Sequence, residues 1–280
     1  HIVMSFNSLY LKNAATWPQY YMILQQELGA TTSLVDFGNQ GSAGKVNAAT
    51  FTGRKFHSSG LSPTWTPSEA LSAFDTPFDL TLESNWLGYA PILTLNGSDE
   101  DMDTPDANYW TRDDSGSNPY SMGMWIKFSG TESAAIFNKQ ISSGNNREWN
   151  WNIMNGKQDW WQRDESAGVS INLLADAVTT PDVWHLVVVT YDAAGGSSAA
   201  DGATFYTDGA AIASTATNNG SYVAMENKTA PPTIGSHNGS HNFFEGGILG
   251  GPWGPWFTQI ELTAAQVKNL YEDMRLGLGI

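Results

Sequence analysis

The sequence contains no cysteine among its 280 residues. This absence excludes disulfides, thiolate nucleophiles and metal sites built on thiolates. Basic residues are also scarce, because 13 Lys and Arg stand against 28 Asp and Glu, for a net charge of −15. A protein that neutralises phosphates needs a basic face, so this balance argues against nucleic acid as a partner.

Long apolar runs are missing as well. No run approaches the roughly 18 residues needed to span a bilayer, and no charged-then-apolar segment opens the chain. The sequence therefore predicts neither membrane insertion nor an export signal. Aromatic residues, by contrast, are abundant, with 12 Trp. Large aromatic side chains either fill the core between two sheets or stand on surfaces where sugars stack.

The middle of the chain consists of short runs rich in β-branched and aromatic residues, separated by Gly, Asn, Asp or Ser. This pattern is typical of consecutive antiparallel strands. The clearest runs lie at residues 121–128, 136–139, 150–153, 184–191 and 203–209. Weaker runs at residues 33–37, 46–51, 91–95, 233–235 and 243–249 predict further strands. The sequence therefore indicates an all-β protein.

Two segments near the ends of the chain have helical spacing instead. Apolar residues at 17–28 recur at helix-like intervals between Pro18 and Gly29, which suit a helix start and stop. Residues 262–274 predict a second short helix with Thr263 as its N-cap. Residues 53–90 hold several prolines and scattered aromatics, and they predict an irregular insertion or contact arm rather than a separate domain.

Several motifs follow one another in an order known from one family. They read Ser121-Met-Gly-Met-Trp-Ile-Lys, Trp184-His-Leu-Val-Val-Val-Thr-Tyr-Asp and Phe205-Tyr-Thr-Asp-Gly. With the Asn-Gly turn after residues 91–95 and the closing segment 262–271, the chain resembles the laminin-G-like domains of the concanavalin A-like lectin/glucanase superfamily. The resemblance implies a two-sheet antiparallel jelly-roll sandwich over residues 31–280, after an N-terminal segment 1–30 with a short helix. The apolar character of Trp125, Ile126, Phe128 and residues 186–189 predicts that they supply the inner faces of such a sandwich.

One segment departs from the family pattern. Residues 250–257 read Gly-Gly-Pro-Trp-Gly-Pro-Trp-Phe where the family has an acidic residue. This pattern is similar to that of laminin-G-like proteins carried by tailed bacteriophages. The resemblance implies a virion component, such as a capsid decoration, fibre or tail protein, with other virion proteins or copies of itself as partners. The implied location is the virion or an extracellular surface.

Four carboxylates gather after the Asn-Gly turn, at Asp99, Asp101, Asp103 and Asp106. Glucanases of the superfamily carry catalytic acids at alternate strand positions, but this cluster follows a turn and lacks the expected Glu. We therefore predict no catalytic residue and expect no enzyme. Clustered hard oxygen donors suit calcium, so the four residues form a weak candidate calcium site. The alternative is a solvated acidic loop.

Four tryptophans lie close together at Trp149, Trp151, Trp160 and Trp161, interleaved with amide side chains and Arg163. Flat aromatic rings beside amide and guanidinium donors suit a sugar, whose C–H faces stack on indole and whose hydroxyls bond polar groups. These five residues are the candidate glycan-binding site. The alternative is that two of the four tryptophans belong to the core.

Two histidines four residues apart, His237 and His241, flank an Asn-Gly-Ser turn that argues against a helix. Ordinary loop histidines are the first interpretation and a metal-binding pair is the second.

The predicted function is that of a non-enzymatic structural or adhesive protein at a virion surface, with weak binding to cell-surface or polysaccharide glycans. The alternatives are a carbohydrate-binding module of a cellular protein and a glycoside hydrolase of the same superfamily.

Overall fold

The computed structural model describes residues 24–26, 33–36, 55–59, 92–103, 106, 110–112, 118–129, 133–141, 143–237, 241–249 and 255–278. The early strands are β1 (Leu24–Gln26), β2 (Ser33–Asp36), β3 (Lys55–Ser59), β4 (Ile92–Asn96) and β5 (Asp101–Asp103). The central strands are β6 (Tyr120–Phe128), β7 (Ala134–Ile141), β8 (Asn146–Met154), β9 (Lys157–Asp164), β10 (Val169–Ala175) and β11 (His185–Tyr191). A 3₁₀ helix, η2 (Gly196–Gly202), precedes β12 (Ala203–Thr207), β13 (Ala210–Ala211), β14 (Ser214–Thr217), β15 (Pro232–Ile234), β16 (Glu245–Leu249), β17 (Trp256–Thr258) and helix α5 (Ala264–Leu278).

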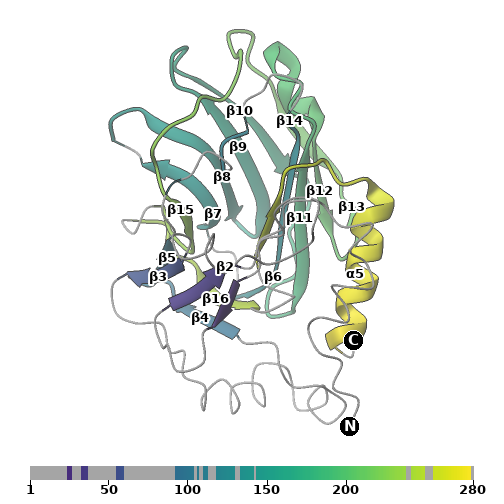
Figure 1. The fold of residues 1–280 in the computed structure, drawn as a ribbon. Helices are drawn as coiled ribbons and strands as arrows, with labels where there is room; N and C mark the ends of the chain where they lie inside the picture. The colour runs from purple at the N-terminus through teal and green to yellow at the C-terminus, as the bar shows by residue number, and fades with distance from the viewer. Residues whose placement is uncertain are drawn as a thin grey trace, which may run out of the picture.

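These strands form two antiparallel sheets that face each other (Figure 1). The larger sheet has the order β1-β2-β3-β5-β15-β7-β8-β9-β10-β14. The smaller has the order β13-β12-β11-β6-β16-β4, with β17 also paired to β6. The predicted all-β sandwich of two antiparallel sheets is therefore confirmed. Each of the five clearest runs forms a strand, although the strands of the last two leave out Trp184 and residues 208–209.

Tight turns set the register of the larger sheet. Asn155 and Gly156 join β8 to β9 with φ angles of 50° and 75°. Positive φ at two successive residues is what a two-residue hairpin turn requires, and an Asn-Gly pair adopts it at little cost. The turn pairs Met154 with Lys157, and the ladder then places Trp151 opposite Trp160.

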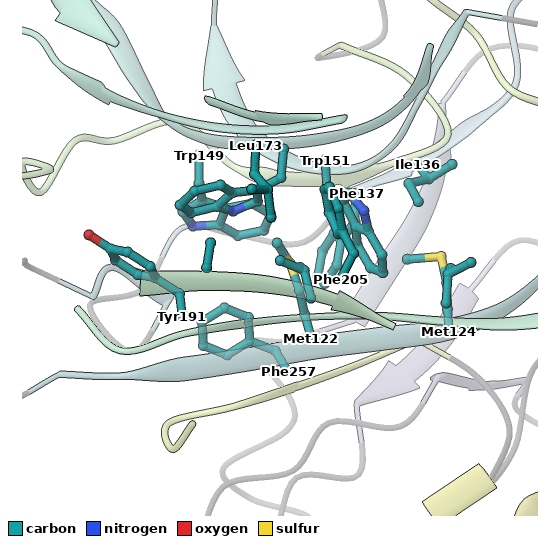
Figure 2. Packing of buried hydrophobic residues seen from close by; sticks show 14 of the residues in the cluster. Met122, Met124, Ile136, Phe137, Trp149, Trp151, Leu173, Tyr191, Phe205 and Phe257 are labelled. Carbon is teal, nitrogen blue, oxygen red and sulfur yellow. The ribbon is translucent and has the colours of Figure 1, made fainter. Parts of the chain in front are cut away.

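The core lies between the sheets and is rich in large rings (Figure 2). Trp149 and Trp151 of β8 point from the larger sheet toward Tyr191 and Met122 of the smaller sheet. Phe257 of β17 stacks on Trp149, with ring centroids 5.9 Å apart. Alternate side chains of each strand meet in this layer, as packing of two sheets face to face requires.

Helix α5 covers the opposite side of the smaller sheet. Thr263 accepts a hydrogen bond from the backbone N–H of Gln266 at 3.3 Å, and Gln266 Oε1 accepts one from the backbone N–H of Thr263 at 2.9 Å. This reciprocal cap confirms the predicted helix start. Trp125, expected on an inner face, lies under the helix instead. It stacks on Tyr271, and its indole N–H contacts Met274 Sδ at 3.4 Å.

The N-terminal prediction was partly wrong. Leu24–Gln26, expected within a helix over residues 17–28, forms strand β1 and pairs with Ser33–Asp36. A strand partner supplies backbone groups with hydrogen bonds, and this outweighs a weak helical spacing. Lys55–Ser59 is likewise a strand within the segment expected to be irregular. The remainder of 17–28 and the predicted strand 46–51 lie outside the described residues.

Candidate functional site

The two faces of β8 and β9 have different environments. Trp149, Trp151 and Trp160 point into the core and have no exposed surface. The indole N–H of Trp160 donates to the Tyr120 hydroxyl at 3.0 Å, within the sandwich. Their rings are therefore not available to a sugar from solvent, and this part of the candidate glycan site is corrected. The alternative interpretation placed two of the four tryptophans in the core, and the structure places three of them there.

Trp161 lies on the other face of the larger sheet. The ladder places it between Asn150 of β8 and Asn172 of β10. Trp161 and Asn172 are partly exposed, whereas Asn150 is buried. Arg163 and Asp159 lie on either side of this row on the same face, because side chains two residues apart on a strand share a face. We call the set Asn150, Asp159, Trp161, Arg163 and Asn172 the outer-face platform.

Asp159 is held firmly within the platform. Its Oδ2 accepts a hydrogen bond from Asn152 at 3.0 Å, and its Oδ1 accepts one from Asn172 at 2.5 Å. Burial raises the pKa of Asp159, and the two amide hydrogen bonds act in the opposite direction. The carboxylate therefore orients the amides on both sides of it.

Arg163 is oriented by its neighbours in the same manner. Its Nη1 donates to the Ser170 hydroxyl at 3.1 Å, and its Nε lies 3.4 Å from Glu165 Oε2. A guanidinium group has five N–H donors, so donors remain after these two contacts. Trp161 and Arg163 are thus the two predicted glycan-site residues that the fold leaves partly exposed together.

The other half of this face is covered. The connection between β15 and β16 brings His237 onto Asn150 and Asn152, and His237 is only 8% exposed. At the neighbouring end of the face, the Lys139 ammonium and the Glu148 carboxylate form an ion pair with no exposed surface. Burial raises the pKa of Glu148, and the Lys139 charge opposes that shift.

The acidic cluster of the sequence is spread out. Asp99 accepts a hydrogen bond from the Asn96 amide, Asp101 from the buried Ser236 hydroxyl, and Asp106 lies 2.9 Å from the Lys139 ammonium. Within the described part of the chain, no three His, Cys, Asp or Glu side chains converge to hold a metal ion. The side chain of Asp103 lies outside that part, so calcium at this cluster stays a prediction.

Sequence reasoning missed Asn150, Asp159 and Asn172 as site residues. The signal that could have found the first of them is the Asn155-Gly156 turn. A two-residue hairpin fixes which residues are paired, so the turn by itself places Asn150 beside Trp161. Alternation likewise separates Trp160 from Trp161, since adjacent residues on a strand face opposite ways.

The comparisons with known proteins agree with the two-sheet fold. The family model Laminin_G_3, described as the concanavalin A-like lectin/glucanases superfamily, matches residues 96–249, which is more than half of the chain. The chain belongs to the concanavalin A-like lectin/glucanase superfamily. The predicted laminin-G-like resemblance is confirmed. No curated protein matches the chain in sequence.

Solved structures of this lectin-like fold include receptor-binding domains of botulinum neurotoxins. The domain of the C/D mosaic serotype has a TM-score of 0.56 at 15% identity and covers 91% of this chain and 51% of its own. The binding domain of neurotoxin DC in complex with SialylT has a TM-score of 0.56 at 12% identity, with 91% and 52% covered. A third structure accompanies the finding that cell entry of botulinum neurotoxin type C depends on interaction with two ganglioside molecules. It has a TM-score of 0.54 at 14% identity and covers 91% of this chain and 51% of its own.

These identities show a shared fold and nothing more specific. The chain spans about half the length of the toxin domains that it matches. Within its described residues, the lectin-like chain has no helix that is both long and apolar enough to cross a membrane.

Proposed function

We propose that the protein binds carbohydrate through the outer-face platform. The observation that carries this proposal is the partly exposed Trp161 ring, bordered in register by Asn150 and Asn172. A sugar places its C–H face on an indole and its hydroxyls on the surrounding polar groups. Arg163 supplies donors on one side of the ring, and Asp159 fixes the Asn172 amide on the other.

The platform suits binding better than hydrolysis. Retaining glycosidases need two carboxyl groups about 5 Å apart, one of which must attack the sugar. Asp159 is 4% exposed, and both its oxygens accept hydrogen bonds from amides. Glu148 is fully buried and paired with Lys139. A receptor-binding role is also what the name of the similar toxin domain describes.

The ligands of two structural neighbours support glycans as the ligand class. One toxin domain was solved with SialylT, and another structure is described by its ganglioside interaction. The virion context predicted from residues 250–257 stays a prediction, because the similar solved structures are toxin receptor-binding domains. Purified particles that contain the chain would support that context.

The test is a glycan array followed by titration calorimetry on the glycans that bind. Wild-type protein should bind at least one sialylated or neutral oligosaccharide, and Trp161→Ala should weaken that binding at least tenfold. Trp161→Phe should retain part of it, because a smaller ring still offers a stacking face.

The matched control is Trp184→Ala. Trp184 is also a partly exposed tryptophan, but it precedes β11 in the smaller sheet. It should leave affinity unchanged. Equal affinities for wild type and Trp161→Ala, or an array without any bound glycan, would overturn the proposal.

A further inference from the structure

The connection between β15 and β16 is anchored by backbone hydrogen bonds on both of its arms. Phe244 donates to the Gly235 carbonyl at 2.8 Å, and His237 donates to the His241 carbonyl at 2.9 Å. Ala135 of β7 donates to the Asn242 carbonyl at 2.9 Å. These bonds fix His237, His241 and Asn242 relative to one another and to the larger sheet.

The Nε2 side of the His237 ring faces an acceptor. Asn152 Oδ1 lies 3.1 Å from His237 Nε2. The orientation of that amide is set, because its Nδ2 donates to Asp159 Oδ2 at 3.0 Å. An acceptor at this distance favours a proton on Nε2, and the lone pair of the neutral ring is then on Nδ1.

Asn150 is compatible with this tautomer. Its side-chain amide lies 3.0 Å from His237 Nε2, and its Oδ1 is a buried acceptor with no hydrogen-bond partner. An amide can present either end to a neighbour. With the oxygen turned to the ring, Asn150 joins Asn152 in accepting from Nε2–H.

The Nδ1 side of the ring faces two further donor groups. His241 Nε2 lies 3.2 Å from His237 Nδ1, and Asn242 Nδ2 also lies 3.2 Å from it. Turning the Asn242 amide end for end puts its Oδ1, the atom that binds a metal ion, in the same place. The two imidazole rings are nearly perpendicular, at 87°. Two nitrogens that bind one tetrahedral zinc ion at 2.0–2.1 Å are about 3.3 Å apart. His241 and Asn242 are exposed, so an ion could reach the group from solvent.

We propose that His237, His241 and Asn242 form a binding site for a divalent transition-metal ion such as Zn²⁺ or Ni²⁺, with water completing the coordination. Metal-ligating histidines commonly donate their second ring N–H to an oriented oxygen, and the Asn152–Asp159 pair provides this oxygen. Imidazole ligands favour this class of ion over calcium.

The experiment measures Zn²⁺ affinity of the full chain by competition with a chelating dye at pH 7.4, after treatment with EDTA. Wild type should bind one ion through this site, and the exposed His241→Ala change should weaken it at least tenfold. Asn242→His should tighten it at least tenfold, because a third imidazole replaces an amide. Asn242 has φ 54°, a conformation that histidine adopts more readily than most residues.

The matched control is His185→Gln. His185 Nδ1 lies 2.7 Å from Asp208 Oδ2 in the smaller sheet, and the change should leave Zn²⁺ affinity unaltered. Long-range ¹H–¹⁵N spectra provide a second measurement. They should show a proton on Nε2 of His237 and a shift of His237 Nδ1 when Zn²⁺ is added.

Equal Zn²⁺ affinity in wild type and His241→Ala would overturn the proposal. A proton on Nδ1 of His237 that persists in excess Zn²⁺ would do the same, since the two histidines would then only be hydrogen-bonded to each other. Neither result depends on whether the outer-face platform binds a sugar.

Discussion

The Lys139–Glu148 pair gives the most direct test of the energetics of this fold. Both side chains are fully buried. Lys139 Nζ also donates to the Lys228 carbonyl at 2.8 Å, and Glu148 accepts from the Thr111 hydroxyl at 2.7 Å and the Lys228 backbone N–H at 2.8 Å. The pair therefore joins β7 and β8 to the two segments that contain Thr111 and Lys228.

Lys139→Met keeps most of the side-chain volume and removes the charge. Glu148 then stays buried without a counter-ion, and breaking a buried pair in this way costs about 3–5 kcal/mol. This is a large part of the roughly 5–15 kcal/mol that stabilises a typical domain. In the double variant Lys139→Met/Glu148→Gln, the amide oxygen can still accept from the Lys228 backbone N–H, and the amide nitrogen can donate to the Thr111 hydroxyl. No fully buried charge is left without a partner, although the partly exposed Asp106 loses its contact with Lys139. The double variant should regain most of the lost stability.

The sign of the pH dependence follows from the same pair. Burial raises the pKa of Glu148, and loss of Lys139 removes the main opposing effect. In Lys139→Met the folded state therefore binds a proton more readily than the unfolded state, so the variant recovers stability as pH falls. It should be least stable relative to wild type near pH 8 and closest to wild type near pH 5.

The assay is urea unfolding followed by tryptophan fluorescence, for wild type, Lys139→Met, Glu148→Gln and the double variant at pH 5 and pH 8. A loss below about 1 kcal/mol for Lys139→Met at pH 8, or a double variant no more stable than Lys139→Met, would refute this reasoning.

Three further predictions concern the tryptophans on the two faces of β9, the titration of His237, and the packing of Gly123 against Trp256. Trp160→Ala should lower the free energy of unfolding by about 3–5 kcal/mol, whereas Trp161→Ala should cost far less because its ring is partly exposed; similar losses in urea unfolding would contradict the assigned faces. The pKa of His237, about 4 when folded against an ordinary value of 6.5, means that the metal-free protein should lose stability as pH falls through this range, by about 2 kcal/mol at pH 5. His237→Gln should flatten the dependence of unfolding free energy on pH. An unchanged dependence would show that His237 does not cause the loss of stability at low pH. Gly123→Ala would place a methyl group against the Trp256 indole, so it should cost about 1–3 kcal/mol and lower Tm; an unchanged Tm would show that the contact can relax.

The strands of the sandwich could be predicted because their local signals agree with the tertiary structure. Residues 121–128 and 184–191 combine β-branched and aromatic side chains, and the structure pairs the strands they form, β6 and β11. Leu24–Gln26 could not be predicted from its own spacing, because its state depends on a partner strand at Ser33–Asp36. Distant pairing of this kind leaves little trace in a short window of sequence.

The candidate site was only half predictable for a related reason. Alternation correctly separates Trp149 and Trp151 from Asn150 and Asn152, but it does not say which face meets solvent. Here both faces of β8 are buried, since Asn150 has no exposed surface and Asn152 is 6% exposed. The covering residue, His237, is far away in sequence and belongs to a loop, so no local pattern of β8 could reveal it.

The coverage of β8 on both sides restricts how the protein can be retargeted. A library of variants intended to recognise a new ligand has few usable positions on that strand, because each substitution there disturbs either the ring-filled interior or the amides around His237. Positions 161, 163 and 172 belong to the neighbouring strands β9 and β10 and are open to solvent in part. Diversity introduced at positions 161 and 163 should alter selectivity with the smallest loss of unfolding temperature, because Asn172 also donates a hydrogen bond to the buried Asp159 carboxylate.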